Sequence, residues 1–388
     1  MSTVLVARPQ RFVAAVGDVA DPNCWSGIPY HFWRAATENG FAAGAARLDL
    51  EWSSWPRRRW NLARLAHGRR PGGFQYSPKF LADAERRVPR DVWAGEVISF
   101  SQHFPRAATV REAGGRISYY VDATFAALSS GRGLDLRLPA DVVRAGLALE
   151  RQNYELADRV IAMASWTAES LGADCGVPAH KIAVVLPGAN LDLPDDWLPE
   201  APKGRPGVDR PFVLGFVGKD WERKGLPMVC EVRDRLDAGG WQAGVLAAGS
   251  APPDLGRRPG VEFAGFIDKR SGPTEFARFL ARCDVGCLFS EHEALGISTL
   301  EFLRAGVPVA GYAIEGPADT IPADAGFRFA AGEPADVVSA TFDRYLRDQA
   351  RQRSFREAAA GHARYVTWRR CVQELARIWA GGTTGGGP

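Results

Sequence analysis

Short apolar runs of strand length recur along the chain, and most are followed by a stretch in which apolar residues return with helical spacing. In the first half the expected strands are FVAAVGDV at residues 12–19, ARLDLEW, EVISFSQHFP at residues 96–105, RISYYVDATF, RVIAMAS and KIAVVLPGANLD. One helix is expected in WSGIPYHFWRAATENGF, opened by Ser26 and Gly27, and a longer one at residues 140–157.

The second half alternates more regularly. Its expected strands are PFVLGFVG, QAGVLAAG, VEFAGFI and VGCLF, separated by helical stretches, and further helices are expected from residue 335 to about 360 and at residues 368–379. Strands that alternate with helices predict right-handed crossovers and parallel, doubly wound sheets, which is the α/β class. A Pro- and Gly-rich stretch at residues 199–210 interrupts the pattern, so we expect a first domain at residues 1–205 and a second from residue 206.

The composition is that of an ordinary globular protein, with 46% hydrophobic and 24% charged residues among 388. The 48 basic and 45 acidic side chains leave a formal net charge of +3, which indicates no nucleic acid partner. Six scattered cysteines suit a reducing compartment, and Cys283 and Cys287 are expected to pack in the core. Because no apolar run has the length of a membrane span and the first residues lack a signal peptide's apolar segment, we expect a cytoplasmic location. Residues 381–388 are expected to form a flexible tail.

The least usual composition lies between Trp52 and Arg70, in WSSWPRRRWNLARLAHGRR. Aromatic and basic residues together suit a surface that lies against anionic headgroups, such as the inner face of a membrane, because Trp prefers the interface and Arg pairs with phosphates. The same mixture suits a phosphate-rich acceptor or a nucleic acid. The alternative is a solvated Arg-rich helix whose tryptophans pack on the domain. The sequence leaves these interpretations open.

Residues 283–312, CDVGCLFSEHEALGISTLEFLRAGVPVAGY, predict a strand, a loop, a short helix and a second strand. Glu293 lies in the loop, and Glu301 lies in the helix, which is expected to begin at Ser298 or Thr299. A strand that passes through a glycine-containing loop into a helix presents backbone N–H groups and the helix dipole to an anion such as a diphosphate. Equally, Ser298 and Glu301 fit a capping box, in which the glutamate reaches back to the helix N-terminus and binds no ligand.

Two further features follow strands, at the carboxyl ends where open α/β sheets bind ligands. GKDWERKG follows the first strand of the second half and carries Lys219, Arg223 and Lys224, three cations suited to a diphosphate. His103 lies at the end of the run at residues 96–105 and is a candidate site residue, although a lone histidine in a loop is more often structural.

In these motifs the sequence resembles the retaining glycosyltransferases of family 4. FVGKDWERKG is similar to that family's basic strand-loop, SEHEALGISTLEFLRAGVPVAG to its motif of two glutamates, KIAVVLPGANLD to its interdomain turn and RYVTWRRCVQEL to its terminal helix. The resemblance covers residues 181–375, whereas the first half matches only at WSGIPYHF and ADRVIAMASWTAESL. It implies the GT-B fold, with two Rossmann-like, doubly wound domains facing a cleft. The donor domain would be residues 206–364, and residues 365–380 would form a helix that crosses back to the first domain.

The resemblance also implies roles for individual residues. Lys219 or Arg223, together with Lys224, would hold the donor's diphosphate, Glu301 would bind the ribose and Glu293 the transferred sugar. Glu293, His103 and Lys224 are the catalytic candidates. The other expected donor contacts are Gly27, Phe266, Ile267, Leu295, Gly296, Ile297 and Ser298. Neither a metal nor a cofactor is expected beside the nucleotide-sugar co-substrate, a UDP-, GDP- or ADP-sugar, because the cations can do a metal's charge work and no Asp-x-Asp precedes the motifs.

Some residues depart from the family's usual pattern. Leu295 replaces a common Phe, the three residues from Phe302 to Arg304 replace small residues, and Gly316 and Pro317 replace a common Gly-Gly. These positions bear on donor identity more than on reaction class. The expected activity is retaining transfer of a sugar to a glycan, a lipid-linked glycan or a small molecule. A sugar-nucleotide epimerase of the same fold and a non-catalytic nucleotide-sugar-binding subunit are the alternatives.

Overall fold

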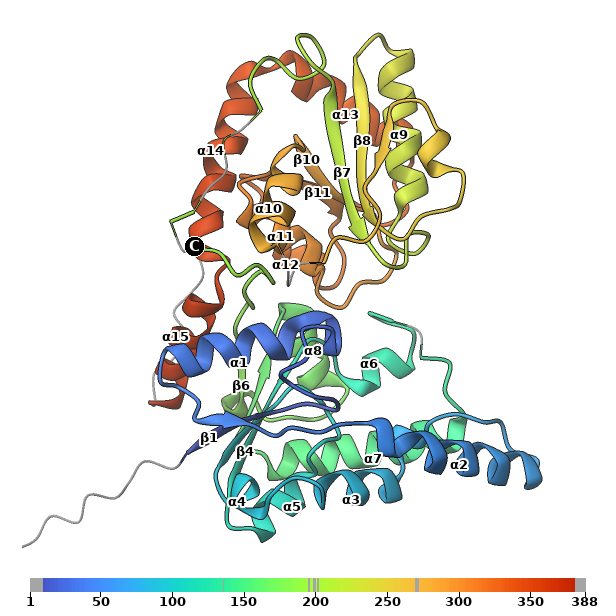
Figure 1. The fold of residues 1–388 in the computed structure, drawn as a ribbon, viewed down its shortest axis with the longest axis vertical. Coiled ribbons are helices and arrows are strands. Elements are labelled where there is room, and N and C mark those ends of the chain that lie inside the picture. The colour runs from blue at the N-terminus through green and yellow to red at the C-terminus, as the bar shows by residue number, and fades with distance from the viewer. Residues whose placement is uncertain are drawn as a thin grey trace, which may run out of the picture. The chain divides into compact units, whose positions relative to one another are not determined.

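The chain divides into two compact units in a computed structural model that describes residues 10–134, 136–194, 196–197, 200, 202–268 and 272–380. Unit 1 comprises residues 1–185 and 372–388, and unit 2 comprises residues 186–371 (Figure 1). The expected tail at residues 381–388 lies outside the described residues. Each unit has its own sheet and its own hydrophobic cores.

Unit 1 is built on a parallel sheet that has six strands among the described residues. Their order across the sheet is β2 (Gly44–Ala45), β1 (Arg11–Ala14), β3 (Glu96–Ser99), β4 (Arg116–Val121), β5 (Arg159–Ala162) and β6 (Ile182–Val184). The strand order reverses between β1 and β3, so the loops after these two strands meet at the carboxyl edge. The Ser101 hydroxyl accepts a hydrogen bond from the Val16 N–H at 3.0 Å and ties these two loops together.

Helices cover both faces of this sheet (Figure 1). They are α1 (Ile28–Glu38), α2 (Ser54–Ala66), α3 (Pro78–Glu85), α4 (Arg90–Trp93), α5 (Ala107–Glu112), α6 (Phe125–Ser129), α7 (Ala140–Leu156), α8 (Ser165–Ala173) and the later part of α15 (Trp368–Trp379). Phe32 of α1 packs on Phe100 and Tyr120 on one face. The chain returns to unit 1 through α15, whose Trp379 contacts Phe41, which confirms the expected return of the last helix.

Unit 2 repeats the architecture with a second parallel sheet, again six-stranded where the structure describes it. The order is β12 (Gly326–Phe329), β11 (Val309–Tyr312), β10 (Val285–Leu288), β7 (Phe212–Gly218), β8 (Ala243–Gly249) and β9 (Val261–Phe263). Its helices are α9 (Leu226–Ala238), α10 (Pro273–Ala281), α11 (Ile297–Arg304), α12 (Pro317–Thr320), α13 (Ala335–Arg347) and α14 (Gln349–Tyr365). The chain reverses direction across the sheet between β7 and β10, which makes this the switch point where Rossmann-like sheets bind ligands.

The predicted class, a doubly wound α/β fold, is confirmed in both units, and three details differ from the sequence-based expectation. The helix expected from residue 335 to about 360 breaks at Asp348, whose carboxylate accepts the Arg351 N–H and so caps α14. The second difference concerns two expected strands. The run at residues 96–105 is a strand only as far as Ser99, and ARLDLEW, residues 46–52, follows the two-residue strand β2 and forms no strand itself.

The third difference concerns the segment between the two units, where the contacts divide the chain at Val185, before the expected boundary at residue 205. Ala189 and Leu191 are buried in a core of unit 2. Arg304, itself buried, donates to the carbonyl groups of Pro194 and Trp197. The arginine that departs from the family's small residues therefore ties this segment to unit 2.

Candidate functional site

The candidate site of unit 2 lies at the switch point, where the loops after β7 and β10 lie side by side. The first loop contains Lys219, Arg223 and Lys224 and runs into α9, and the second contains Glu293 and runs into α11. Because β7 and β10 are paired neighbours in a parallel sheet, their carboxyl ends bring the basic loop against the glutamate loop. The two motifs that the sequence singled out are therefore one site.

Two glycines make this approach close enough for contact. Gly225 caps α9 with a φ of +81°, a conformation that favours glycine, and a Cβ there would lie 2.6 Å from the Phe289 carbonyl oxygen. A Cβ on Gly218 would lie 2.7 Å from the Cδ atom of Lys224. Because Gly218 has no side chain, the Lys224 side chain can pass over the end of β7.

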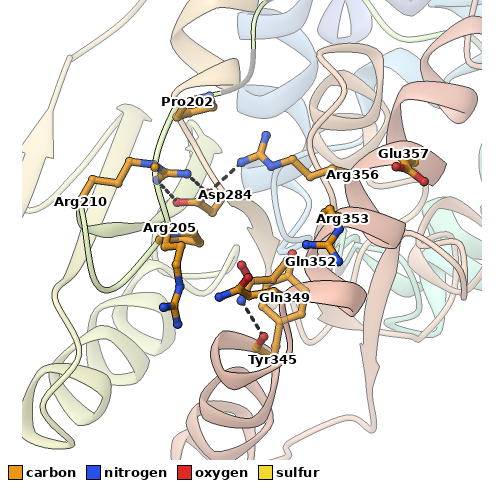
Figure 2. Close-up of a pocket in the computed structure, with 12 residues that line it drawn as sticks. Pro202, Arg205, Arg210, Asp284, Tyr345, Gln349, Gln352, Arg353, Arg356 and Glu357 are labelled. Atoms are coloured by element: carbon orange, nitrogen blue, oxygen red, sulfur yellow. Dashed lines mark hydrogen bonds and ion pairs between the residues drawn. The ribbon is translucent and has the colours of Figure 1, made fainter.

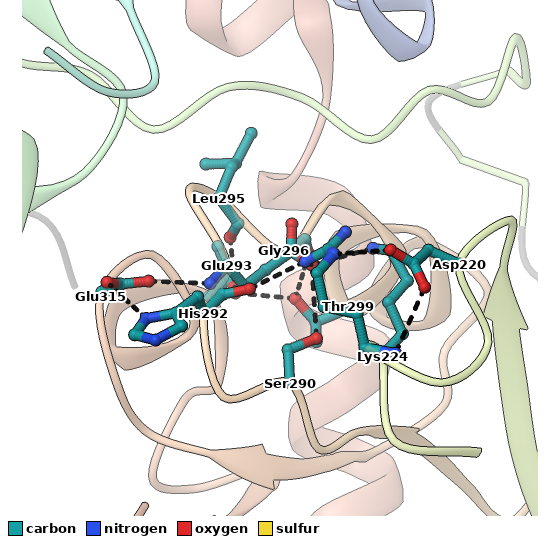
Figure 3. A network of polar contacts seen from close by, with 11 residues as sticks. Asp220, Lys224, Ser290, His292, Glu293, Leu295, Gly296, Thr299 and Glu315 are labelled. Atoms are coloured by element: carbon teal, nitrogen blue, oxygen red, sulfur yellow. Dashed lines mark hydrogen bonds and ion pairs between the residues drawn. The ribbon is translucent and has the colours of Figure 1, made fainter. Parts of the chain in front are cut away.

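Glu293 accepts charge-assisted hydrogen bonds from both neighbouring cations (Figure 3). Its Oε2 atom is 2.9 Å from Lys224 Nζ and 3.4 Å from an Arg223 guanidinium nitrogen. The side chains of Glu293 and Lys224 are each only 13% exposed, so water screens this pair weakly. Burial raises the pKa of Glu293, but Lys224 and then Arg223 more than offset it, and the pKa lies below its ordinary value. Glu293 is therefore ionised at neutral pH.

Further polar contacts, which were not among the sequence-based expectations, hold the backbone of the glutamate loop. The Glu293 N–H donates to the Glu315 carboxylate at 2.7 Å, and Arg223 donates to the His292 carbonyl at 2.8 Å (Figure 3). Glu315 has a φ of +46°, which is strained for a residue with a side chain, and it follows β11, the next strand of the sheet. An acidic residue beside a glycine at a strand end was the only available clue to this role.

The N-terminus of α11 differs from the expected one. The helix begins at Ile297, and its N-cap is Gly296, which has a φ of +78° and offers no side chain to the helix. Ser298 lies inside the first turn, and its buried hydroxyl has no hydrogen-bond partner in the part of the chain that the structure describes. The capping-box interpretation, with Ser298 as the cap, is therefore wrong. Leu295, just before the helix, and Glu301, in its second turn, are both buried.

Phe266 and Ile267, two of the expected donor contacts, lie in the segment GFIDK at residues 265–269, which follows β9. Phe266 is 62% exposed, and Lys219 Nζ lies 5.8 Å from the centre of its ring. Lys219 has no ion pair within the described ranges, unlike Arg223 and Lys224. Ile267 packs against a core of unit 2, and Lys269 of the same motif lies outside the described residues.

Gly27 and His103 belong to the equivalent edge of unit 1. Gly27 is the N-cap of α1 with a φ of +87°, and the two residues before it, Trp25 and Ser26, also have positive φ. His103 is 3% exposed in the loop after β3, and its Nε2–H donates to the Gly146 carbonyl at 2.9 Å. Burial lowers its pKa to about 4, so the imidazole is neutral at neutral pH.

A cavity of about 350 Å³ lies at the amino end of β10, at the opposite end of this strand from the candidate donor site (Figure 2). Asp284, which precedes β10, is buried there between Arg210 and Arg356, with nitrogen–oxygen distances of 2.6 and 2.8 Å. Ligands of open α/β sheets collect at the carboxyl ends of strands, so we do not assign this cavity to the donor. The two arginines neutralise a buried carboxylate and hold the segment before β7.

Comparison with known proteins identifies the fold class. HepE of Anabaena, solved in complex with UDP-glucose, matches with a TM-score of 0.64 over 96% of this chain and 99% of HepE, at 14% identity. That likeness shows the fold, and the class is GT-B. Residues 211–348, which contain every candidate residue of unit 2, match the family model "Glycosyl transferases group 1".

Two curated relatives also match part of the chain. The 2-deoxystreptamine N-acetyl-D-glucosaminyltransferase of Streptomyces fradiae is 33% identical over 195 residues, which are 45% of this chain and 44% of that enzyme. The D-inositol 3-phosphate glycosyltransferase of Kribbella flavida is 26% identical over 239 residues, 58% of this chain and 56% of the relative. The chain thus spans about half the length of these relatives. Over the matched parts the chain is similar to the glycosyl transferases group 1 family and to these two glycosyltransferases.

Proposed function

We propose that this protein transfers a sugar from a nucleotide-sugar donor to an acceptor hydroxyl, with retention at the anomeric carbon. The observation that carries the proposal is the buried pair of Glu293 and Lys224 at the switch point of unit 2, beside the N-terminus of α11. Retention rests on the resemblance to the retaining glycosyltransferases of family 4. The name of HepE's ligand makes UDP-glucose the first donor to test.

In the proposed reaction the bond from the anomeric carbon to the diphosphate oxygen breaks, and its electron pair leaves with the nucleoside diphosphate. The acceptor oxygen forms the new bond to the same carbon, and its proton passes to the departing phosphate. Lys219, which has no ion pair within the described residues, and Lys224 would neutralise the leaving group, with the first amides of α11 as further donors. Lys224 would then be shared between the diphosphate and Glu293.

The ionised Glu293 would meet the hydroxyls of the transferred sugar and favour positive charge at the anomeric carbon. Glu301 would bind the ribose, and Leu295, Ile297, Ser298, Phe266 and Ile267 would complete the donor contacts of unit 2. In unit 1, Gly27 and the neutral His103 are proposed as further donor contacts. Because His103 is buried, it would act as a hydrogen-bonding group and not as a charged acid.

The direct test is Glu293→Gln, which keeps the shape of the side chain and removes its charge. We expect the rate of sugar transfer to fall by about a hundredfold or more, while affinity for UDP changes by less than about threefold, because the lost interaction acts on the transition state. Glu291→Gln is the matched control, since Glu291 is an exposed residue of the same loop. Transfer rate and calorimetric affinity would be measured with UDP-, GDP- and ADP-sugars.

The names of the two relatives supply the first acceptors, 2-deoxystreptamine and D-inositol 3-phosphate. Full activity of Glu293→Gln would refute the proposed role of this residue. An isomerised sugar after incubation with donor alone would identify an epimerase instead. Tight donor binding without turnover on any acceptor would identify a non-catalytic binding subunit.

A further inference from the structure

Helix α2 carries most of the Trp- and Arg-rich segment, and the structure sorts its side chains into two sets. The inward set fixes the helix to unit 1. Arg64 is 6% exposed, and its guanidinium makes two hydrogen bonds of 2.8 Å to Asp141 at the start of α7. Trp60 donates to the Gly72 carbonyl at 2.9 Å and packs against Phe74. These residues explain why α2 lies firmly on the unit, and they take no part in an outer surface.

Trp52, which precedes the helix, is also structural. Its ring stacks on Phe80 with centres 5.5 Å apart, and the Arg87 guanidinium lies 4.0 Å from its centre on the ring face. Two of the three tryptophans that suggested a lipid surface therefore pack on the domain, as the alternative interpretation expected.

The outward set has the opposite character. Trp55, Leu62 and Leu65 are 68%, 64% and 57% exposed, and they are three of the four most exposed large hydrophobic side chains among the described residues. Positions 55, 62 and 65 are seven and three residues apart, which puts them on one face of the helix. A cluster of this kind on a single surface element marks a contact site, whereas isolated exposed apolar residues need no explanation.

Arginines lie among these apolar residues. Arg58 and Arg59 are three or four residues from both Trp55 and Leu62, so they share the same face; Arg57 is also exposed but lies toward the other side of the helix, seven residues before Arg64. The helix contains no Asp or Glu, and none of these three arginines forms an ion pair within the ranges that the structure describes. We call Trp55, Arg58, Arg59, Leu62 and Leu65 the α2 outer face. Figure 1 shows α2 at the margin of unit 1, clear of the sheet.

We propose that the α2 outer face binds the surface of an anionic lipid bilayer. The apolar side chains would enter the interface between headgroups and acyl chains, and the arginines would pair with lipid phosphates while their stems lie along the apolar residues. A helix of 13 residues is about 20 Å long and would lie in the plane of the surface. Among the described residues, no helix is long and apolar enough to cross a bilayer.

Two other partners fit these residues less well. A nucleic acid would use the arginines but would leave two exposed leucines against a polar backbone. A second copy of the chain, docked by two-fold symmetry through the same face, would bring the unpaired arginines of both copies together. Only an anionic surface with an apolar interior accounts for both sets of side chains on one face.

The test is cosedimentation of the full chain with vesicles of phosphatidylcholine alone or mixed with phosphatidylserine, at low and high salt. We expect binding to the anionic vesicles only, weakened by salt. The triple variant Trp55→Ser, Leu62→Ser, Leu65→Ser should bind roughly tenfold more weakly or worse, as should Arg57→Gln, Arg58→Gln, Arg59→Gln. Because all six side chains are exposed, both variants should keep the melting temperature of the parent, which is measured alongside.

Matched controls distinguish a site from general stickiness. Val208→Ser with Val337→Ser removes exposed apolar residues elsewhere, and Arg235→Gln, Arg278→Gln, Arg344→Gln makes the same change in net charge; both should bind like the parent. Equal losses in the controls, or no vesicle binding at all, would overturn the proposal. So would a dimer that the apolar variant abolishes, or binding to single-stranded DNA that the same variants remove. Transfer to a water-soluble acceptor is measured separately and should not change.

Discussion

At the scale of single residues, Ser298 has the most informative surroundings. Its hydroxyl is buried in the first turn of α11 without a hydrogen-bond partner among the described residues. Buried polar groups are normally satisfied, and one that is not costs the fold about 1 kcal/mol or more. A ligand with acceptor oxygens at the N-terminus of α11 would satisfy it, which agrees with a phosphate at this position.

Ser298→Ala therefore separates stability from binding. We expect the unliganded variant to be as stable as the parent or more stable by up to about 1 kcal/mol, because the unsatisfied hydroxyl is gone. Affinity for UDP should fall by about fivefold, the equivalent of one lost hydrogen bond. Thermal unfolding and calorimetry measure the two quantities. Unchanged affinity would mean that the hydroxyl does not contact the nucleotide.

At the scale of elements, the site depends on where two helices begin. Gly225 and Gly296 both cap helices with left-handed backbone conformations, and both lie against the end of β10 or its loop. A Cβ on Gly296 would lie 3.1 to 3.3 Å from Leu288, Thr320 and Pro317, so the start of α11 is confined on all sides. The position of its amides is thus set by packing as well as by backbone conformation.

Gly296→Ala tests this confinement, with Gly332→Ala as its matched control. Both glycines have positive φ, of +78° and +73°, but a Cβ on Gly332 meets nothing within 4 Å. Each variant should lose about 1 kcal/mol of stability from backbone strain. Only Gly296→Ala should lose more than that and also bind UDP more weakly, because α11 must shift. Equal behaviour of the two variants would show that packing around Gly296 does not position the helix.

At the scale of the whole molecule, two buried titratable groups of unit 1 act on stability in opposite directions. Burial lowers the pKa of His103 from 6.5 to about 4. The contribution of the neutral imidazole to stability is therefore fully present above pH 6.5 and is lost as the pH falls toward 4. Burial raises the pKa of Glu150 from 4.5 to about 7, although four donors, among them the first N–H groups of α6, partly offset it. Its contribution is complete below pH 4.5 and is lost as the pH rises toward 7.

The variant Glu150→Gln isolates the second effect. A pKa raised from 4.5 to about 7 corresponds to a loss of about 3 kcal/mol between these two pH values. We expect the parent to lose stability over this range relative to Glu150→Gln, whose melting temperature should lack that slope whatever its absolute value. Glu169→Gln, an exposed glutamate of α8, is the control and should follow the parent. The same slope in all three proteins would refute the assignment.

The sequence alone determined the regular parts of this protein. Apolar runs separated by helical periodicity are local patterns, and they sufficed to predict doubly wound sheets, the carboxyl-end position of Lys219, Arg223, Lys224 and Glu293, and a helix at residues 368–379. The return of that helix to the first domain was implied only by the family resemblance. Local patterns failed where contacts distant in sequence compete with them. The capping box at Ser298 is such a case, because packing against β10 and α12 fixes Gly296 as the cap.

Only the tertiary structure decided which side chains meet. Lys224 and Glu293 are 69 residues apart and pair because β7 and β10 are neighbours, an adjacency that no local pattern specifies. Glu315 joins them from a third strand end. In the Trp- and Arg-rich segment, Asp141 of α7 draws Arg64 inward and leaves Trp55, Leu62 and Leu65 outside. Composition could name these residues, but burial and pairing across the fold determined which of them are buried and which stay exposed.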